Sequence, residues 1–116
     1  MSQTSALAAG QVRDAAPLFA ALGDETRIRL LLRLSQRGPE SITRLSTKSA
    51  VSRQAITKHL TVLSQAGLVR DTRRGRERIW RLEQERLAEA REYLDRISRQ
   101  WDEALDRLKE FVEDTR

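Results

Sequence analysis

The stretch SRQAITKHLTVLSQAGLV, residues 52–69, decides the fold. Ser52 is suited to cap the start of a helix, because its hydroxyl can accept a hydrogen bond from a free amide of the first turn. Gly67 is suited to end the helix, because glycine enters the left-handed backbone region without a steric penalty. Between them the apolar residues fall at helical spacing on one face: Ile56, Leu60 and Leu63. The stretch therefore predicts an amphipathic helix over residues 52–66.

The other face of this helix is polar, and its side chains have the donors and acceptors that reach base edges and phosphates in a DNA groove: Arg53, Gln54, Thr57, Lys58 and Thr61. An ordinary surface helix is also half polar, so this stretch alone does not distinguish a DNA-recognition helix from a surface helix. The segment that follows it does. Residues 69–82 predict two short strands around a turn at Arg74-Gly75. A helix that runs into an arginine-rich hairpin is the layout of a winged helix-turn-helix, with a recognition helix at 52–66 and a wing at 69–82.

The composition fits one small helical domain. The chain has 116 residues, of which 34% are charged and only 4% are aromatic, so the core must consist mostly of Leu, Ile, Val and Ala. This favours a mainly α fold with a small β-hairpin. No cysteine is present, which excludes disulfides and thiolate metal sites. No apolar run of about 18 residues or secretory signal is found, so we expect a cytoplasmic protein without a membrane partner.

Basic charge is concentrated in one part of the chain. The net charge of +5 divides into +3 for residues 1–51, +6 for residues 52–82 and −4 for residues 83–116. The middle segment carries eight Lys or Arg and two Asp or Glu. Such a basic patch on one segment is the electrostatic footprint of a polyanion-binding protein. A solvated basic surface would not be expected to cluster on the helix and hairpin in this way.

The segments before residue 52 predict three more helices. We expect a flexible N-terminus at 1–10, a helix at 12–22 that Pro17 either opens or bends, and a helix at 25–36 capped by Asp24. Apolar residues on several sides of the 25–36 helix predict that it is covered on more than one side. A short helix at 43–49 followed by the 52–66 helix gives the helix-turn-helix. We place the DNA-binding domain at 11–82.

Three separated motifs carry a family resemblance. They are residues 21–31 (ALGDETRIRLL), the pattern from Ser52 through Lys58-His59-Leu60 to Val69, and Gly75-Arg76 with Trp80-Arg81-Leu82. In order and spacing, residues 15–82 resemble the ArsR-type winged-helix repressors. The resemblance implies a homodimeric, operator-binding transcriptional repressor that a signal releases from DNA. The chain departs from the family pattern at Lys48 and Ser49, where small or apolar residues are usual.

Residues 83–116 predict one long dimerisation helix. Its apolar residues are spaced by three and four in a sustained heptad stripe: Leu87, Ala90, Leu94, Ile97, Trp101, Ala104, Leu108 and Phe111. At about 1.5 Å per residue the helix is nearly 50 Å long, more than a domain of this size can cover. We therefore expect a dimer interface formed by this helix and the first one. The alternative is that the helix folds back on the first two helices of its own chain.

Ten residues are candidates for DNA contact. Residues at the start of the recognition helix are placed to meet bases or phosphates, later ones to meet phosphates, and the arginines at the hairpin tip to meet the backbone or the minor groove. The candidates are Ser52, Arg53, Gln54, Thr57, Lys58, His59, Thr61, Arg73, Arg74 and Arg76. The only histidine, His59, lies where the family usually has one, and we assign it a structural or phosphate-facing role.

Catalysis, cofactors and metals are not expected. No second His, no Cys and no glycine-rich phosphate loop is present to support an enzyme or a bound cofactor. Relatives that sense metals use cysteines in the short helix or His and carboxylates in the last helix, and residues 41–49 have no Cys. We predict no metal site. Whether oxygen ligands form one at the dimer interface cannot be told from the sequence.

The sequence predicts a transcriptional regulator that binds double-stranded operator DNA as a homodimer, most simply a repressor. The alternative is a protein-interaction or architectural module that docks through its long helix and binds DNA only secondarily. Neither the operator, the regulated genes nor the effector can be told from the sequence.

Overall fold

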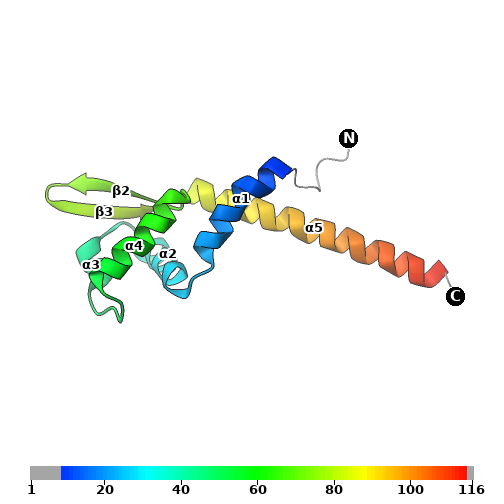
Figure 1. Cartoon of the computed structure of the whole chain (residues 1–116), viewed down its shortest axis with the longest axis horizontal. Coiled ribbons are helices and arrows are strands. Elements are labelled where there is room, and N and C mark those ends of the chain that lie inside the picture. The colour runs from blue at the N-terminus through cyan, green and yellow to red at the C-terminus, as the bar shows by residue number, and fades with distance from the viewer. Residues whose placement is uncertain (1–8, 115–116) are drawn as a thin grey trace.

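The chain forms helices and short strands throughout residues 9–114, the part that the computed structural model describes (Figure 1). In chain order they are α1 Ala9–Leu22, α2 Glu25–Arg37, β1 Glu40–Ser41, α3 Ile42–Ser46, α4 Arg53–Gln65, β2 Val69–Arg74, β3 Glu77–Leu82 and α5 Gln84–Asp114. Helices α1 to α4 and the sheet form the body of the molecule, and α5 projects from it. The mainly α fold with a β-hairpin is confirmed.

The sheet has the strand order β1–β3–β2, and both strand pairs are antiparallel. Strands β2 and β3 form the predicted hairpin, but its turn lies at Gly75-Arg76, one residue later than the predicted Arg74-Gly75. Gly75 has φ 65°, in the left-handed region that glycine enters without a steric penalty. Strand β1 was not predicted, because two residues are too short to show an alternating pattern. It pairs with β3 through Glu40 and Trp80.

The core lies where helices α1 to α4 meet the start of the hairpin. Its largest fully buried side chains are Leu18, Leu45, Ile56, Leu60, Leu63 and Leu68. Three of these are the apolar stripe predicted for α4, so that helix has its polar face turned to solvent. Fully burying such a side chain contributes about 1.5–3 kcal/mol, which fixes the orientation of α4.

The bounds of two helices differ from the predictions. Helix α1 begins at Ala9, so Ala9 and Gly10 are helical rather than frayed, and Pro17 lies inside the helix rather than at its start. Residues 1–8 of the expected flexible N-terminus lie outside the described residues. Helix α3 covers Ile42–Ser46 instead of 43–49. The Ser46 hydroxyl donates a hydrogen bond to the Ile42 carbonyl at 2.8 Å. Lys48 has a left-handed φ of 58°, which is incompatible with a right-handed helix, so the helix ends before it.

Helix α2 is covered on one side only, which corrects the prediction of a doubly covered helix. Leu30, Leu31 and Leu34 are buried, whereas Ile28 and Leu32 keep 43% and 54% of their surface exposed. Its start is as predicted, because the Asp24 side chain accepts a hydrogen bond from the Arg27 amide at 3.0 Å. Such an amide donor stabilises the ionised carboxylate, and this hydrogen bond lowers the pKa of Asp24.

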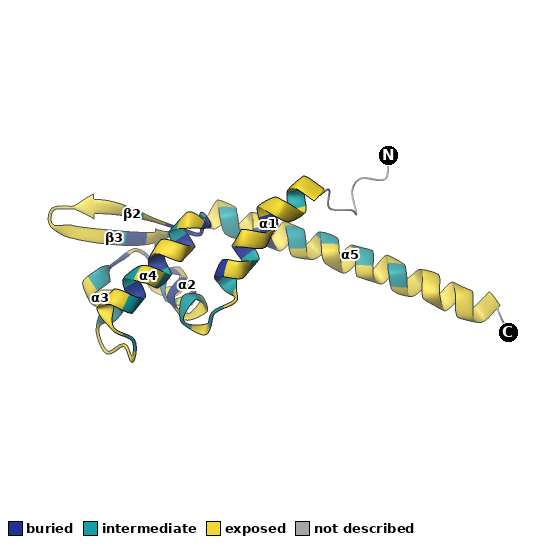
Figure 2. Cartoon of the chain, viewed as in Figure 1, coloured by how far each residue is buried: buried dark blue, intermediate teal, exposed yellow. Residues whose placement is uncertain are grey.

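The distal part of α5 has no cover from its own chain within residues 9–114. Only Ala90 is buried, and Leu87 and Tyr93 are half-buried where α5 meets the body. Beyond them the stripe is open to solvent, with Ile97 46% and Trp101 65% exposed (Figure 2). The molecule is therefore long and narrow, 69 × 30 × 22 Å. The sequence analysis left open that this helix folds back on the first two helices. That alternative is wrong for residues 94–112, which do not pack on those helices.

A polar cluster joins α1, α4 and α5. Tyr93 donates its hydroxyl hydrogen bond to the Asp14 carboxylate at 2.9 Å, and Arg86 lies 3.4 Å from the same oxygen. The hydrogen bond from Tyr93, followed by the interactions with Arg86, lowers the pKa of Asp14. Arg86 also donates from Nε to the Ala66 carbonyl at the end of α4, at 2.9 Å. The start of α5 is thus fixed to both α1 and α4.

Candidate nucleic-acid interface

Helix α4 begins as the sequence predicts. Ser52 has an extended backbone, φ −65° and ψ 157°, and its hydroxyl accepts from the Ala55 amide at 3.1 Å. At the other end Gly67 has φ 80° and its amide donates to the Ser64 carbonyl at 3.0 Å. With both ends fixed, the first turn of α4 presents its remaining amides and the exposed Ser52 to solvent.

The solvent face of α4 carries most of the candidate residues. Arg53, Gln54, Lys58 and Thr61 are exposed, and Thr57 is half-buried beside them. The two threonine hydroxyls donate within the helix, from Thr57 to the Arg53 carbonyl and from Thr61 to the Thr57 carbonyl, each at 2.9 Å. The long side chains of Arg53, Gln54 and Lys58 are therefore the parts of this face that can extend furthest toward another molecule.

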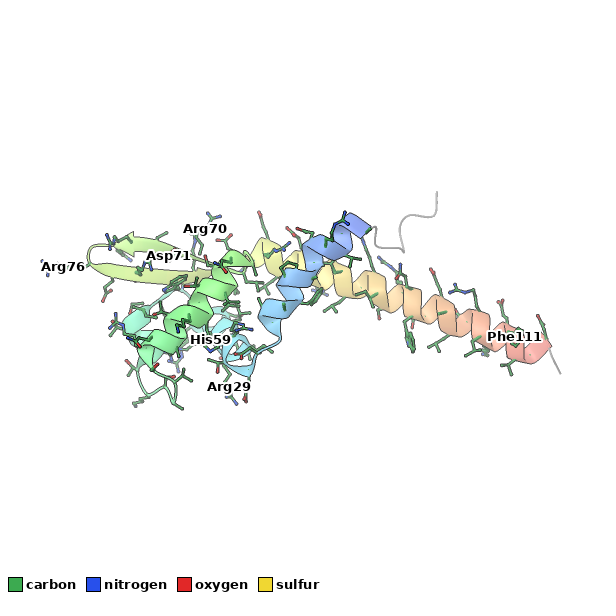
Figure 3. All side chains as sticks on the ribbon, viewed as in Figure 1. Arg29, His59, Arg70, Asp71, Arg76 and Phe111 are labelled. Atoms are coloured by element: carbon green, nitrogen blue, oxygen red, sulfur yellow. The ribbon has the colours of Figure 1, made fainter. Side chains whose placement is uncertain are left out.

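The arginines of the hairpin divide into two groups. Three arginines of the strands lie near carboxylates: Arg78 is 3.0 Å from Asp71, and at the base of the hairpin Arg70 and Arg81 lie 3.5 and 3.7 Å from Glu83. At its tip, Arg73, Arg74 and Arg76 are exposed and have no acidic partner among residues 9–114. Figure 3 shows Arg76 at the outer end of the hairpin, pointing away from the body. The unpaired positive charge is therefore concentrated at the tip.

His59 is held against the start of α2 (Figure 3). Its Nδ1 lies 3.3 Å from Arg27 Nη1 and 3.7 Å from an Asp24 oxygen, and the side chain is 23% exposed. Nδ1 can accept a hydrogen bond from Arg27 in one tautomer of the ring and carries a hydrogen that faces Asp24 in the other. Arg27 also donates to the Ala21 carbonyl at the end of α1, at 2.7 Å. Of the two roles assigned to His59, structural or phosphate-facing, these contacts favour the structural one. Its contact with DNA stays a prediction.

The comparisons with known proteins agree with this geometry. A family model described as a helix-turn-helix domain matches residues 22–72. The chain is 47% identical over 68 residues to an uncharacterized HTH-type transcriptional regulator of Bacillus subtilis, YuzN, covering 53% of this chain and 74% of that protein. A solved structure of an ArsR-like transcriptional regulator from Rhodococcus sp. RHA1 superimposes with a TM-score of 0.78 and 39% identity, over 88% of this chain and 95% of that one. The chain belongs to the ArsR family of transcriptional regulators.

ArsR-family membership confirms the resemblance drawn from the three motifs. It also confirms the prediction of a non-enzymatic protein, because the relatives and structural neighbours are transcriptional regulators. The arsenical resistance operon repressor of Escherichia coli is 37% identical over 59 residues, about half of each chain. No helix among residues 9–114 combines the length and apolarity that crossing a membrane requires. Within the same residues, no three His, Cys, Asp or Glu side chains come together as a metal site requires.

The structure exposes further residues near the predicted DNA-contact face of α4 that the sequence analysis did not name. Val62 and Gln65 are exposed on the same side of α4 as Lys58 and Thr61. Helical spacing alone could have found them. Arg44 and Lys48, in and after α3, are also exposed. Arg44 and Lys48 come near α4 only because α3 packs against it, so no pattern in the sequence connects them to that helix.

Proposed function

We propose that two copies of this chain bind a palindromic DNA operator and repress transcription from it. The observation that carries the proposal is the exposed polar face of α4 beside a hairpin whose tip holds three arginines without an acidic partner in residues 9–114. A recognition element needs side chains that read bases and cations that hold phosphates, and this surface has both. The similarity to the repressor of the E. coli arsenical resistance operon supports repression as the outcome.

The residues divide by their position on the proposed interface. Arg53, Gln54 and Thr57 lie in the first turns of α4, the part of a recognition helix that contacts base edges. Ser52 offers donors to a phosphate at the helix start, and Lys58 and Thr61 lie further along, toward the backbone. Arg73, Arg74 and Arg76 would meet the backbone or the minor groove beside the site. In this assignment residues 11–82 form the DNA-binding domain.

The proposed homodimer rests on the uncovered stripe of α5. Exposed apolar surface of this extent is uncommon on a monomer and marks an interaction surface. A two-fold axis near the middle of the stripe brings matching surfaces together, and α1 lies beside the start of the same helix. The proposed interface residues are those of the uncovered stripe: Leu94, Ile97, Trp101, Ala104 and Leu108. Leu87 and Ala90, which the sequence analysis also assigned to the interface, pack against the core of their own chain instead. Residues 83–116 are then the dimerisation segment.

A footprint on DNA selected from a random pool tests the proposal. A dimeric repressor should protect one preferred sequence with two-fold symmetry, with half-sites about 10 bp apart or a multiple of this. Protection without a preferred sequence would instead support the architectural module, in which DNA binding is secondary to docking through α5.

The first prediction concerns base reading by α4. Replacing Gln54 by Ala should weaken binding to the preferred operator by about 1–3 kcal/mol and relax its specificity, because a bidentate base contact is lost. Competition binding with operator and random duplexes measures both effects. Gln36→Ala, an exposed glutamine of α2 outside the proposed interface, is the matched control and should change neither. Equal losses on both duplexes would show that Gln54 contacts phosphate rather than bases.

The second prediction concerns the hairpin tip. Replacing Arg74 and Arg76 by Ala should weaken binding to all sequences similarly and reduce the slope of log affinity against log salt by up to about 4 for a dimer, since fewer counterions are released. The control is Arg70→Ala with Arg81→Ala, two arginines at the base of the hairpin that lie beside Glu83. An unchanged slope in the tip variant would remove the hairpin from the interface.

A further inference from the structure

A hollow of about 420 Å³ lies between α2 and α3, outside the residues of α4 and the hairpin to which DNA contacts are assigned above. We call it the basic hollow. It is lined by four cationic residues and one threonine: Arg33, Arg37, Arg44, Lys48 and Thr47. These residues are spread over sixteen positions of the sequence, and the packing of α3 beside the end of α2 gathers them.

Only one of the four cations has an acidic partner within residues 9–114. Arg33 Nε lies 2.7 Å from the Glu40 carboxylate, and its Nη2 donates to the Arg44 carbonyl at 2.8 Å. Arg37, Arg44 and Lys48 are exposed and form no ion pair in the same part of the chain. Three uncompensated positive charges therefore surround one concavity, which raises the local positive potential and favours a multiply charged anion.

The turn after α3 places one of these cations. Thr47 ends the helix by donating its hydroxyl hydrogen bond to the Thr43 carbonyl at 2.8 Å. Lys48 follows with φ 58°, the single non-glycine residue of positive φ in the described chain. Asn and Gly occupy this backbone region more easily than Lys does, so local backbone preference does not account for a lysine here. Lys48 is one of the residues that line the hollow.

We infer that the basic hollow binds a phosphate group. Guanidinium groups match the oxygens of phosphate in pairs, and a lysine ammonium adds a point charge. A second hollow of about 610 Å³ adjoins the first and shares Arg33, Thr47 and Lys48 with it. It extends to Val51 and Ile56, so it offers apolar surface to the rest of a ligand and reaches the segment that leads into α4. The phosphate can belong to a free phosphorylated small molecule or to the DNA backbone, and the second source rests on the proposed function.

Inorganic pyrophosphate is the probe for the first source. Titrated calorimetrically into the full chain without DNA, in a phosphate-free buffer, it should bind saturably. The variant Arg37→Gln, Arg44→Gln, Lys48→Gln should bind it at least about tenfold more weakly, since charge-assisted hydrogen bonds are lost. The control Arg91→Gln, Arg99→Gln, Lys109→Gln removes the same charge from exposed positions of α5 and should bind as the unmodified chain does.

The same variants test the second source through the salt dependence of binding to a duplex. A smaller slope for the hollow variant than for the control assigns the site to backbone phosphates. Saturable pyrophosphate binding with equal slopes assigns it to a free ligand. If the hollow variant equals the control in both measurements, the inference is overturned, and the operator footprint stands independently of it.

A single substitution separates loss of binding from loss of folding. Asparagine adopts a φ near 58° readily, so Lys48→Asn should leave the thermal unfolding midpoint unchanged or slightly raised. It should nevertheless weaken the phosphate-dependent signal about two- to fivefold, because one charged contact is removed. A folded Lys48→Asn protein with an unchanged signal in both measurements would remove Lys48 from the site.

Discussion

The double substitution Ile97→Glu, Trp101→Glu is expected to convert the proposed dimer into a monomer or an aggregate with weak, non-cooperative DNA binding. Both side chains lie in the uncovered stripe of α5, 46% and 65% exposed in the single chain. Burial of each is worth about 1.5–3 kcal/mol, so four copies in a dimer contribute on the order of 6–12 kcal/mol. The substitution also places carboxylates opposite their symmetry mates in an apolar contact.

Sedimentation velocity measures this effect directly. The control is Gln84→Glu with Ala88→Glu, which adds the same charge to exposed positions of α5 away from the stripe. The control should remain dimeric, and circular dichroism should show the same helix content in both variants. A double variant that sediments as a dimer and binds operator normally would show that the stripe is not the interface.

The substitution Arg33→Met is expected to lower the free energy of unfolding by about 3 kcal/mol, or the melting temperature by about 10 °C. Glu40 is 7% exposed and its carboxylate lies 2.7 Å from Arg33 Nε. Without the guanidinium, a buried carboxylate loses its partner, and the Arg44 carbonyl loses a donor. Since Glu40 opens β1, the change weakens the junction of α2, β1 and α3.

The double variant Arg33→Met, Glu40→Leu should recover most of that loss, because it leaves no uncompensated buried charge. Urea unfolding of the two single variants and the double variant gives the coupling free energy between the residues. If Arg33→Met unfolds at the same urea concentration as the unmodified chain, the ion pair makes no net contribution to stability.

Features with local chemical causes could be predicted from the sequence. Ser52 and Gly67 bound α4 because capping depends on the residue itself, and Gly75 marks the hairpin for the same reason. The end of α3 could not be placed, because it depends on hydroxyl groups that bond back to the helix and on an unusual φ at Lys48. Strand β1 exists only because β3 lies beside it.

The candidate site was predictable to a similar degree. The polar face of α4 follows from helical spacing, and the structure exposes it. The exposure of Ile28 and Leu32 did not follow, since an apolar residue in the sequence does not say which side of a helix is covered. His59 shows the same limit, because its neighbours Arg27 and Asp24 come from another helix. The basic hollow combines residues of two helices and a turn, and only the packing of these elements shows that the residues surround one concavity.

The contact of Arg86 with the Ala66 carbonyl has a consequence for the spacing of DNA half-sites. It fixes the end of α4 to the first turns of α5, so the direction of one helix sets the direction of the other. In a dimer, the angle at which two α5 helices cross then determines the separation of the two α4 helices. The helical rise from Arg86 to the middle of the stripe gives an arm of about 17 Å, over which a change of about 10° moves the end of α4 by about 3 Å. This is close to the spacing of adjacent base pairs, about 3.4 Å. The crossing angle of the two α5 helices would therefore set the number of base pairs between the half-sites that the dimer can bind.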